Sequence, residues 1–73
     1  MIITDGIHII HRYGDVKELH RFARKAGINR CWFDANPRHP HYDKPKRMPL
    51  WKLVNAGAEY REARALAKMM RNK

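Results

Sequence analysis

Residues 38–43 carry five side chains that can do chemistry within one short segment. They read Arg38-His39-Pro40-His41-Tyr42-Asp43, which supplies a guanidinium, two imidazoles, a phenol and a carboxylate. Proline lacks a backbone donor and disfavours both helices and central strands. With Pro40 inside the segment and Pro37 and Pro45 beside it, we expect an irregular loop that binds a ligand or takes part in a reaction.

A divalent metal is the first ligand that this loop suggests. His41 and Asp43 supply an imidazole and a carboxylate, and His11 and His20 lie upstream, where a short α/β fold can bring them to the same place. Such ligands suit zinc, iron or manganese and leave positions open for water or a phosphate oxygen. We therefore identify these four residues as candidate metal ligands, or as catalytic residues of a phosphoesterase or nuclease.

The triplet His41-Tyr42-Asp43 also has two interpretations without a metal. In one, a histidine acts as general acid or base, while Asp43 fixes its tautomer and Arg30 or Arg38 neutralises a phosphate. In the other, the triplet is structural: Asp43 caps a turn, Tyr42 packs in the core and His41 bonds to the backbone. The sequence leaves all of these interpretations open.

Positive charge dominates the chain. It has 16 Lys and Arg residues against 7 Asp and Glu, a formal net charge of +9, and the cations are spread from Arg12 to Lys73. Such a basic surface favours polyanionic partners. We predict binding to a phosphate-bearing partner, nucleic acid above all, through seven cations: Arg21, Arg24, Lys25, Arg38, Lys44, Lys46 and Arg47.

Two other roles fit the same charge. The basic surface can dock on an acidic protein of the host or of the bacterium, which would make the chain an interaction protein. The charge can also serve solubility alone. The charge pattern does not rank a nucleic acid above an acidic protein.

Size and composition restrict the class of protein. With 73 residues we expect a single domain, 1–73, that buries about 60 to 65% of its unfolded surface. A core of this size has no room for a large substrate cavity. It is compatible with a homodimer. Cys31 is the only cysteine, so we expect no internal disulfide and a cytoplasmic location, in a bacterial or phage-infected cell. No apolar run is long enough for a signal or a membrane span, so we expect no membrane partner.

Caps, glycines and apolar spacing predict the elements. In chain order we expect strands 1–4 and 7–11, a helix 15–26, a strand 29–34, a loop 35–45, a helix from 46 or 49 to 56, an extended piece 58–60 and a last helix. Asp5-Gly6 predicts a tight turn, and Asp15 with Glu18 predicts a capping box for a helix that Gly27 ends. The predicted fold class is α/β, with a mixed sheet of three to four strands and about three helices.

Helical spacing assigns an inward face to each helix. The expected inward residues are Val16, Leu19, Phe22, Ala23 and Ala26 in the first, Leu50, Trp51, Leu53 and Val54 in the second, and Ala63, Leu66, Ala67 and Met70 in the last. Tryptophans beside cations can stack on bases. In a domain of this size we nevertheless expect Trp32 and Trp51 to be core anchors.

Short motifs are spread along most of the chain. They are His11, Asp15, Glu18-Leu19-His20, Phe22-Ala23, Gly27, Arg30, Trp32-Phe33, His41-Tyr42-Asp43 and Gly57-Ala58. Together they resemble a family of short bacterial and phage proteins, a domain of unknown function, although Asp34 stands where that pattern has Gln. The resemblance implies no activity or substrate. It marks His41-Tyr42-Asp43 as the shared part of the hexapeptide and leaves Arg38 with the basic surface.

Overall fold

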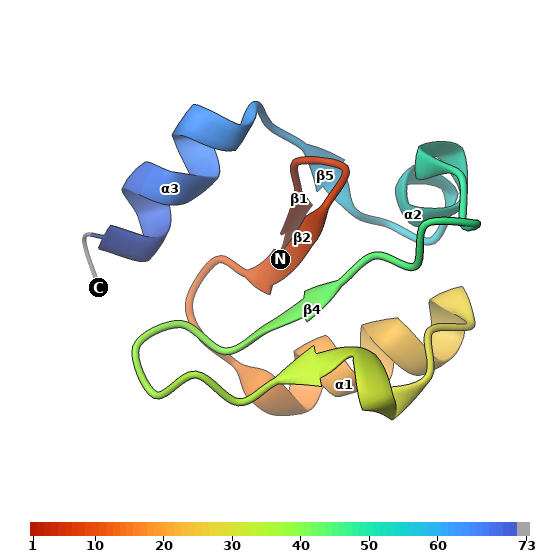
Figure 1. Cartoon of the computed structure of the whole chain (residues 1–73), viewed down its shortest axis with the longest axis horizontal. Coiled ribbons are helices and arrows are strands. Elements are labelled where there is room, and N and C mark those ends of the chain that lie inside the picture. Colours follow the sequence, from red (N-terminus) through yellow and green to blue (C-terminus); the bar gives the residue numbers. More distant parts are fainter. Residues whose placement is uncertain (72–73) are drawn as a thin grey trace.

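A five-stranded sheet with the strand order β3-β4-β2-β1-β5 organises the chain (Figure 1). The computed structural model describes residues 1–71, without the side chains of the last two. The elements are β1 Ile2–Thr4, β2 His8–His11, α1 Val16–Ala26, the 3-10 turn η1 Arg30–Trp32, β3 Phe33–Asp34, β4 His41–Asp43, α2 Leu50–Asn55, β5 Glu59–Tyr60 and α3 Ala63–Arg71. Strand β1 pairs antiparallel with β2 and parallel with β5. The prediction of a small α/β domain with a mixed sheet is confirmed, with one strand more than the upper number expected.

The first two strands form the predicted hairpin. Gly6 adopts a φ of 93°, which glycine takes without steric cost. The Asp5 carboxylate accepts hydrogen bonds from the backbone N–H groups of Ile7 and His8, at 2.8 and 2.7 Å. Since turn geometry sets the register of a hairpin, these local contacts align β1 with β2.

Helix α1 begins and ends where the sequence predicts. The Asp15 carboxylate accepts a hydrogen bond from the backbone N–H of Glu18 at 3.1 Å, and Gly27 takes the left-handed conformation at a φ of 83°. Leu19 and Phe22 are buried on the predicted inward face. Both ends and the buried face of this helix are therefore confirmed.

The prediction of an irregular loop is wrong for the second half of the hexapeptide. Residues 41–43 form β4, which pairs with β2 on one side and with β3 on the other. Pro40 and Pro45 lie outside the strand, where their missing backbone donors cost no ladder bond. An aromatic residue such as Tyr42 suits a half-buried sheet, so residues 41–43, which lie between the two prolines, are free to pair.

The turn η1 replaces most of the strand predicted over residues 29–34. The Asn29 side chain accepts a hydrogen bond from the backbone N–H of Cys31 at 3.0 Å. Local bonds of this kind compete with strand pairing. Strand β3 is consequently reduced to Phe33 and Asp34.

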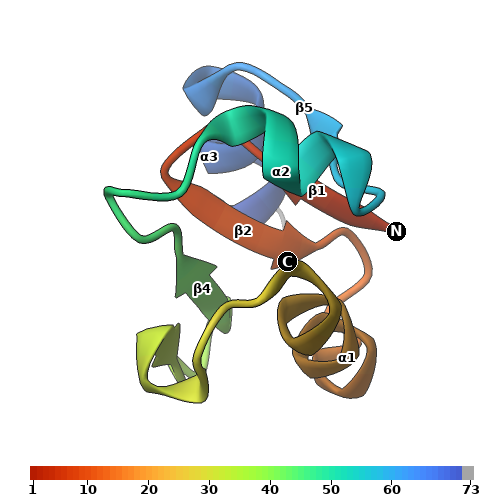
Figure 2. The ribbon, with the colours of Figure 1, turned by 90° about the vertical axis from the view of Figure 1, so that its right-hand side faces the viewer.

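Two cores lie on opposite faces of the sheet. The larger one, under α1 and α2, consists of Ile2, Ile9, Leu19, Phe22, Ala23, Ile28, Tyr42, Leu53 and Ala58. The smaller one, under α3, consists of Ile3, Ile10 and Leu66. Figures 1 and 2 show α1 and α3 on opposite sides of β1 and β2. The sheet residues of the core under α3 come from β1 and β2 alone.

Both tryptophans lie at the surface, so the prediction that they anchor the core is wrong. Trp51 is 60% exposed and Trp32 is 40% exposed. Helix α2 meets the core through Leu53, with Leu50 partly packed beside it. Trp51 and Val54 share another face of the same short helix, because residues three apart are neighbours on a helix.

The predicted inward face of α3 is right for Leu66 and wrong for Ala63 and Ala67, which are exposed. Met69 packs partly against the core in their place, and Met70 lies outside the described side chains. Since the sheet contributes only two buried apolar residues to this core, Ile3 and Ile10, a single large side chain of α3 is enough to cover them.

Candidate functional site

The structure places the four predicted metal or catalytic residues in three separate environments. Successive side chains of a strand point to opposite faces, so His41 and Asp43 lie on the face opposite to Tyr42. His20 contacts Tyr42 on the α1 side of the sheet. His11 ends β2 and contacts the start of α1. Only His41 and Asp43 are brought together, at 3.6 Å between Nε2 and Oδ1.

His41 is 9% exposed and held in one orientation. Its Nδ1 lies 3.0 Å from the carbonyl oxygen of His39, so Nδ1–H donates and Nε2 carries the free lone pair of the neutral ring. Nε2 faces two carboxylate oxygens, at 3.6 Å for Asp43 and 3.7 Å for Asp34. Donor atoms around a tetrahedral zinc lie about 3.4 Å apart. Among the residues that the structure describes, however, only His11, Asp15 and Glu18 bring three ligand atoms within 4.8 Å of one another, so His41, Asp34 and Asp43 do not form a metal site in this arrangement.

Two residues of this face were missed at the sequence level. Asp34 lies opposite His41 in the β3–β4 pairing, and His8 lies opposite Asp43 in the β2–β4 pairing. The His8 ring packs edge-on against that of His41, with centroids 5.6 Å apart. A strand prediction for residues 41–43 would have pointed to these two residues. Side chains alternate between the faces of a strand, so His41 and Asp43 then share one face with their neighbours on the adjacent strands, and Tyr42 lies on the other.

Asp5 extends the same group of side chains at the hairpin. Its Oδ2 lies 3.2 Å from Nδ1 of His8. Burial by itself would raise the pKa of Asp5, but hydrogen bonds from the backbone of His8 and Ile7 and the nearby His8 ring hold its pKa below the ordinary value. Asp5 is thus an ionised partner for His8 at neutral pH.

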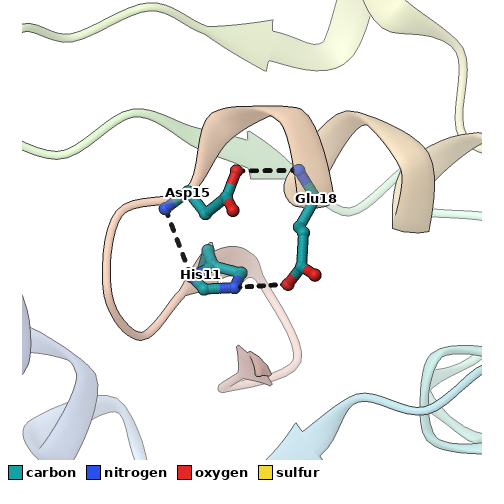
Figure 3. Close-up of side chains that lie close together, drawn as sticks. All are labelled: His11, Asp15 and Glu18. Atoms are coloured by element: carbon teal, nitrogen blue, oxygen red, sulfur yellow. Dashed lines mark hydrogen bonds and ion pairs between the residues drawn. The ribbon is translucent and has the colours of Figure 1, made fainter.

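His11 forms a closed set of hydrogen bonds with Asp15 and Glu18 (Figure 3). Its Nδ1 accepts from the backbone N–H groups of Tyr13 and Asp15, at 3.1 and 3.2 Å. Its Nε2 lies 2.8 Å from Glu18 Oε2 and 2.9 Å from the N-terminal ammonium of Met1. Ligand atoms of His11, Asp15 and Glu18 lie within 4.8 Å of one another, but a metal would have to displace contacts that both ring nitrogens already make. The contacts tie the end of β2 to the first turn of α1.

His20 is hydrogen-bonded to the triplet tyrosine from the other face of the sheet. Its Nδ1 lies 2.6 Å from the Tyr42 hydroxyl, and its ring packs edge-on against Phe33 at a centroid distance of 4.5 Å. Burial and the Arg30 cation lower the pKa of His20. Burial raises the pKa of Tyr42, against the opposing effect of Arg30. Both groups are therefore neutral near neutral pH.

Carboxylates of this chain contact histidines and backbone groups rather than lysines and arginines. The side-chain pairs are Asp5 with His8, Glu18 with His11, and both Asp34 and Asp43 with His41. Asp15 caps α1. Among the side chains that the structure describes, Arg61 is the only Lys or Arg in an ion pair with a carboxylate, that of Glu59 at 2.7 Å. The remaining described cations keep their charge available.

Three of the predicted nucleic-acid contacts lie together on α1. Arg21, Arg24 and Lys25 are exposed. Two of them, Arg21 and Lys25, also line an open cleft of about 220 Å³ between α1, β1 and the end of α2. The other lining residues are Ile2, Glu18, Phe22 and Ala56.

The other four predicted contacts flank β4. Arg38 is exposed in the loop before the strand, and Lys46 and Arg47 are exposed in the turn after it. Figure 1 shows these two connections at opposite ends of β4. Lys44 differs from the others, because its Nζ donates hydrogen bonds to two carbonyl oxygens of the turn. The turn after β4 therefore presents two free cations and uses the third to hold its own shape.

The fold and these surfaces define a small basic α/β protein with a mixed five-stranded sheet. Within residues 1–71, no helix combines the length and the apolar character that crossing a bilayer requires. The chain belongs to the family described as "Protein of unknown function (DUF4031)", whose model matches residues 2–73. This confirms the resemblance noted from the short motifs. Neither a search of curated proteins nor a search of solved structures found a match.

Proposed function

We propose that this protein binds nucleic acid through the exposed cations of α1 and of the turn between β4 and α2. The observation that carries the proposal is the separation of charges: four carboxylates contact histidines, and among the described lysines and arginines Arg61 alone is paired with a carboxylate. Cations that are not neutralised within the protein can exchange with the counterions of a phosphate backbone, which is the main source of affinity for nucleic acid.

The arrangement of the cations supports the same function. Arg21 and Lys25 lie one helical turn apart on α1, with Arg24 between them in sequence. Lys46 and Arg47 are adjacent and exposed. Backbone-directed contacts of this kind position a nucleic acid without reading its sequence. We therefore propose binding with little sequence preference.

Salt dependence is the direct test of this proposal. Each phosphate contact contributes about −0.7 to −0.9 to the slope of log affinity against log salt. Five contacts predict a loss of affinity of about 100-fold between roughly 50 and 200 mM salt. Fluorescence anisotropy of a labelled oligonucleotide measures it. An affinity that stays constant over this range would contradict the proposal, and equally tight binding of polyglutamate would favour an acidic protein as partner.

His41 favours a second candidate function, the hydrolysis of a phosphoester. Nε2 is the ring nitrogen left to accept a proton, because Nδ1–H is engaged by the His39 carbonyl. In this role Nε2 takes a proton from the attacking water, and the carboxylates of Asp34 and Asp43 stabilise the imidazolium that forms.

A His41→Gln variant tests this second function. General base catalysis contributes about 100-fold to 10,000-fold to a rate, so we expect kcat for a fluorogenic phosphodiester to fall by at least the lower figure. Arg24→Ala is the matched control, since this cation lies on α1, across the sheet from His41, and its removal should leave kcat unchanged. A His41→Gln protein that cleaves at the wild-type rate would eliminate His41 as the base.

A further inference from the structure

Trp51 exposes an unusually large apolar surface on a small charged protein. The side chain is 60% exposed, whereas α2 is anchored by Leu53, which is fully buried. In the part of the chain that the structure describes, no aromatic ring or guanidinium packs against the Trp51 indole. The indole is thus not needed to hold the helix, and it is accessible to a ligand.

Exposed cations precede and follow this indole in the chain. Lys46 and Arg47 lie in the turn that leads into α2, and Lys52 is the next residue of the helix. All three are exposed and none is in an ion pair with a described carboxylate. The acidic residues closest in sequence on either side are Asp43, which faces His41, and Glu59, which pairs with Arg61. The segment that carries Trp51 therefore has exposed positive charge that no described carboxylate neutralises.

We propose that Trp51 is a stacking platform for an unpaired base, so that the preferred ligand is single-stranded nucleic acid. This inference rests on the proposed function and names its substrate class. A base in a duplex has both faces covered by its neighbours, whereas an unpaired base can stack on an aromatic ring. Nonspecific single-strand binders combine such rings with cations that follow the backbone. Trp51 supplies the ring, and Lys46, Arg47 and Lys52 supply the cations.

The chain offers a direct optical test, because it contains two tryptophans. In a Trp32→Phe variant the emission comes from Trp51 alone, and in a Trp51→Phe variant it comes from Trp32 alone. We expect an oligothymidylate of roughly 12 nucleotides, within the usual site size, to quench the first variant strongly. Inorganic polyphosphate, which has the charge but no bases, should leave this emission unchanged.

Affinity measurements with matched substitutions complete the test. Trp51→Leu keeps an apolar side chain but removes the ring, and should weaken oligothymidylate binding about tenfold, the usual effect of one lost stacking contact. Trp51→Phe should retain most of the affinity. Val54→Ala, on the same helix face, should bind as wild type. Because both positions are exposed, none of these changes should affect folding, which circular dichroism checks.

The outcomes separate the inference from the function on which it rests. Salt-dependent binding without quenching of Trp51, or with full affinity in Trp51→Leu, would overturn the stacking inference and leave nucleic-acid binding in place. Equal quenching by polyphosphate would also overturn it. Failure to bind any nucleic acid at low salt would overturn both proposals.

Discussion

Simultaneous replacement of Arg21, Arg24 and Lys25 by alanine is expected to weaken nucleic-acid binding about 100-fold at roughly 0.1 M salt. The estimate follows from three lost phosphate contacts, each contributing about 0.7 to 0.9 to the salt slope. The slope itself should become shallower by about two. Alanine is the best helix former, so α1 should remain intact. Anisotropy titrations at several salt concentrations measure both changes.

A pair of variants distinguishes a defined surface from net charge. Arg21 and Lys25 are four residues apart on α1, and Arg64 and Lys68 have the same spacing on α3, on the other side of the sheet. Each double alanine variant removes the same charge. We expect the α1 pair to weaken binding and the α3 pair to have little effect. Equal losses from both would show that net charge, and not the α1 surface, determines the affinity.

The second large effect is expected at Tyr42, which is 1% exposed and is among the largest fully buried side chains of the chain. Replacement of a buried aromatic residue by alanine costs about 3 to 5 kcal/mol. A core in a domain of this size supplies only about 3 to 5 kcal/mol in total. The Tyr42→Ala protein should therefore be largely unfolded at room temperature, as measured by circular dichroism and urea titration.

Tyr42→Phe is the control for that result. It keeps the ring and its packing against Phe33 and removes only the hydroxyl that His20 contacts at 2.6 Å. A lost hydrogen bond of this kind costs about 1 kcal/mol, so the urea midpoint should fall modestly. A Tyr42→Ala protein with the wild-type midpoint would contradict the placement of β4 in the core.

The elements that could be predicted are those that local chemistry determines. The Asp5-Gly6 turn and the Asp15 and Gly27 ends of α1 depend on side chains that bond to backbone groups a few residues away. Such contacts exist in any fold that contains the segment, because their partners are close in sequence. The order of strands and helices follows from them together with the apolar spacing.

The secondary structure of residues 41–43 could not be predicted in the same way. Prolines around residues 41–43 indicate a loop when the segment is considered alone. Pairing of β4 between β2 and β3 depends on strands that lie far away in sequence. That pairing puts Tyr42 in the core and His41 with Asp43 on the other face. The four candidate residues His11, His20, His41 and Asp43 therefore lie in three separate places, with only His41 and Asp43 together.

The exposure of Trp51 could not be predicted from the sequence either. Apolar spacing in α2 allows Leu50, Trp51, Leu53 or Val54 to point inward. Only the larger core, which accepts Leu53 and part of Leu50, decides between them. The exposed indole of Trp51, on which the stacking inference depends, is therefore a consequence of tertiary packing.

The sequence by itself determined the family, the large positive charge and the candidate residues, since these depend only on composition and on short motifs. The tertiary structure decided which charges meet. Strand register and the start of α1 bring carboxylates to His8, His11 and His41. The same packing leaves the described lysines and arginines other than Arg61 without a carboxylate partner, and this is the basis of the proposed binding to nucleic acid.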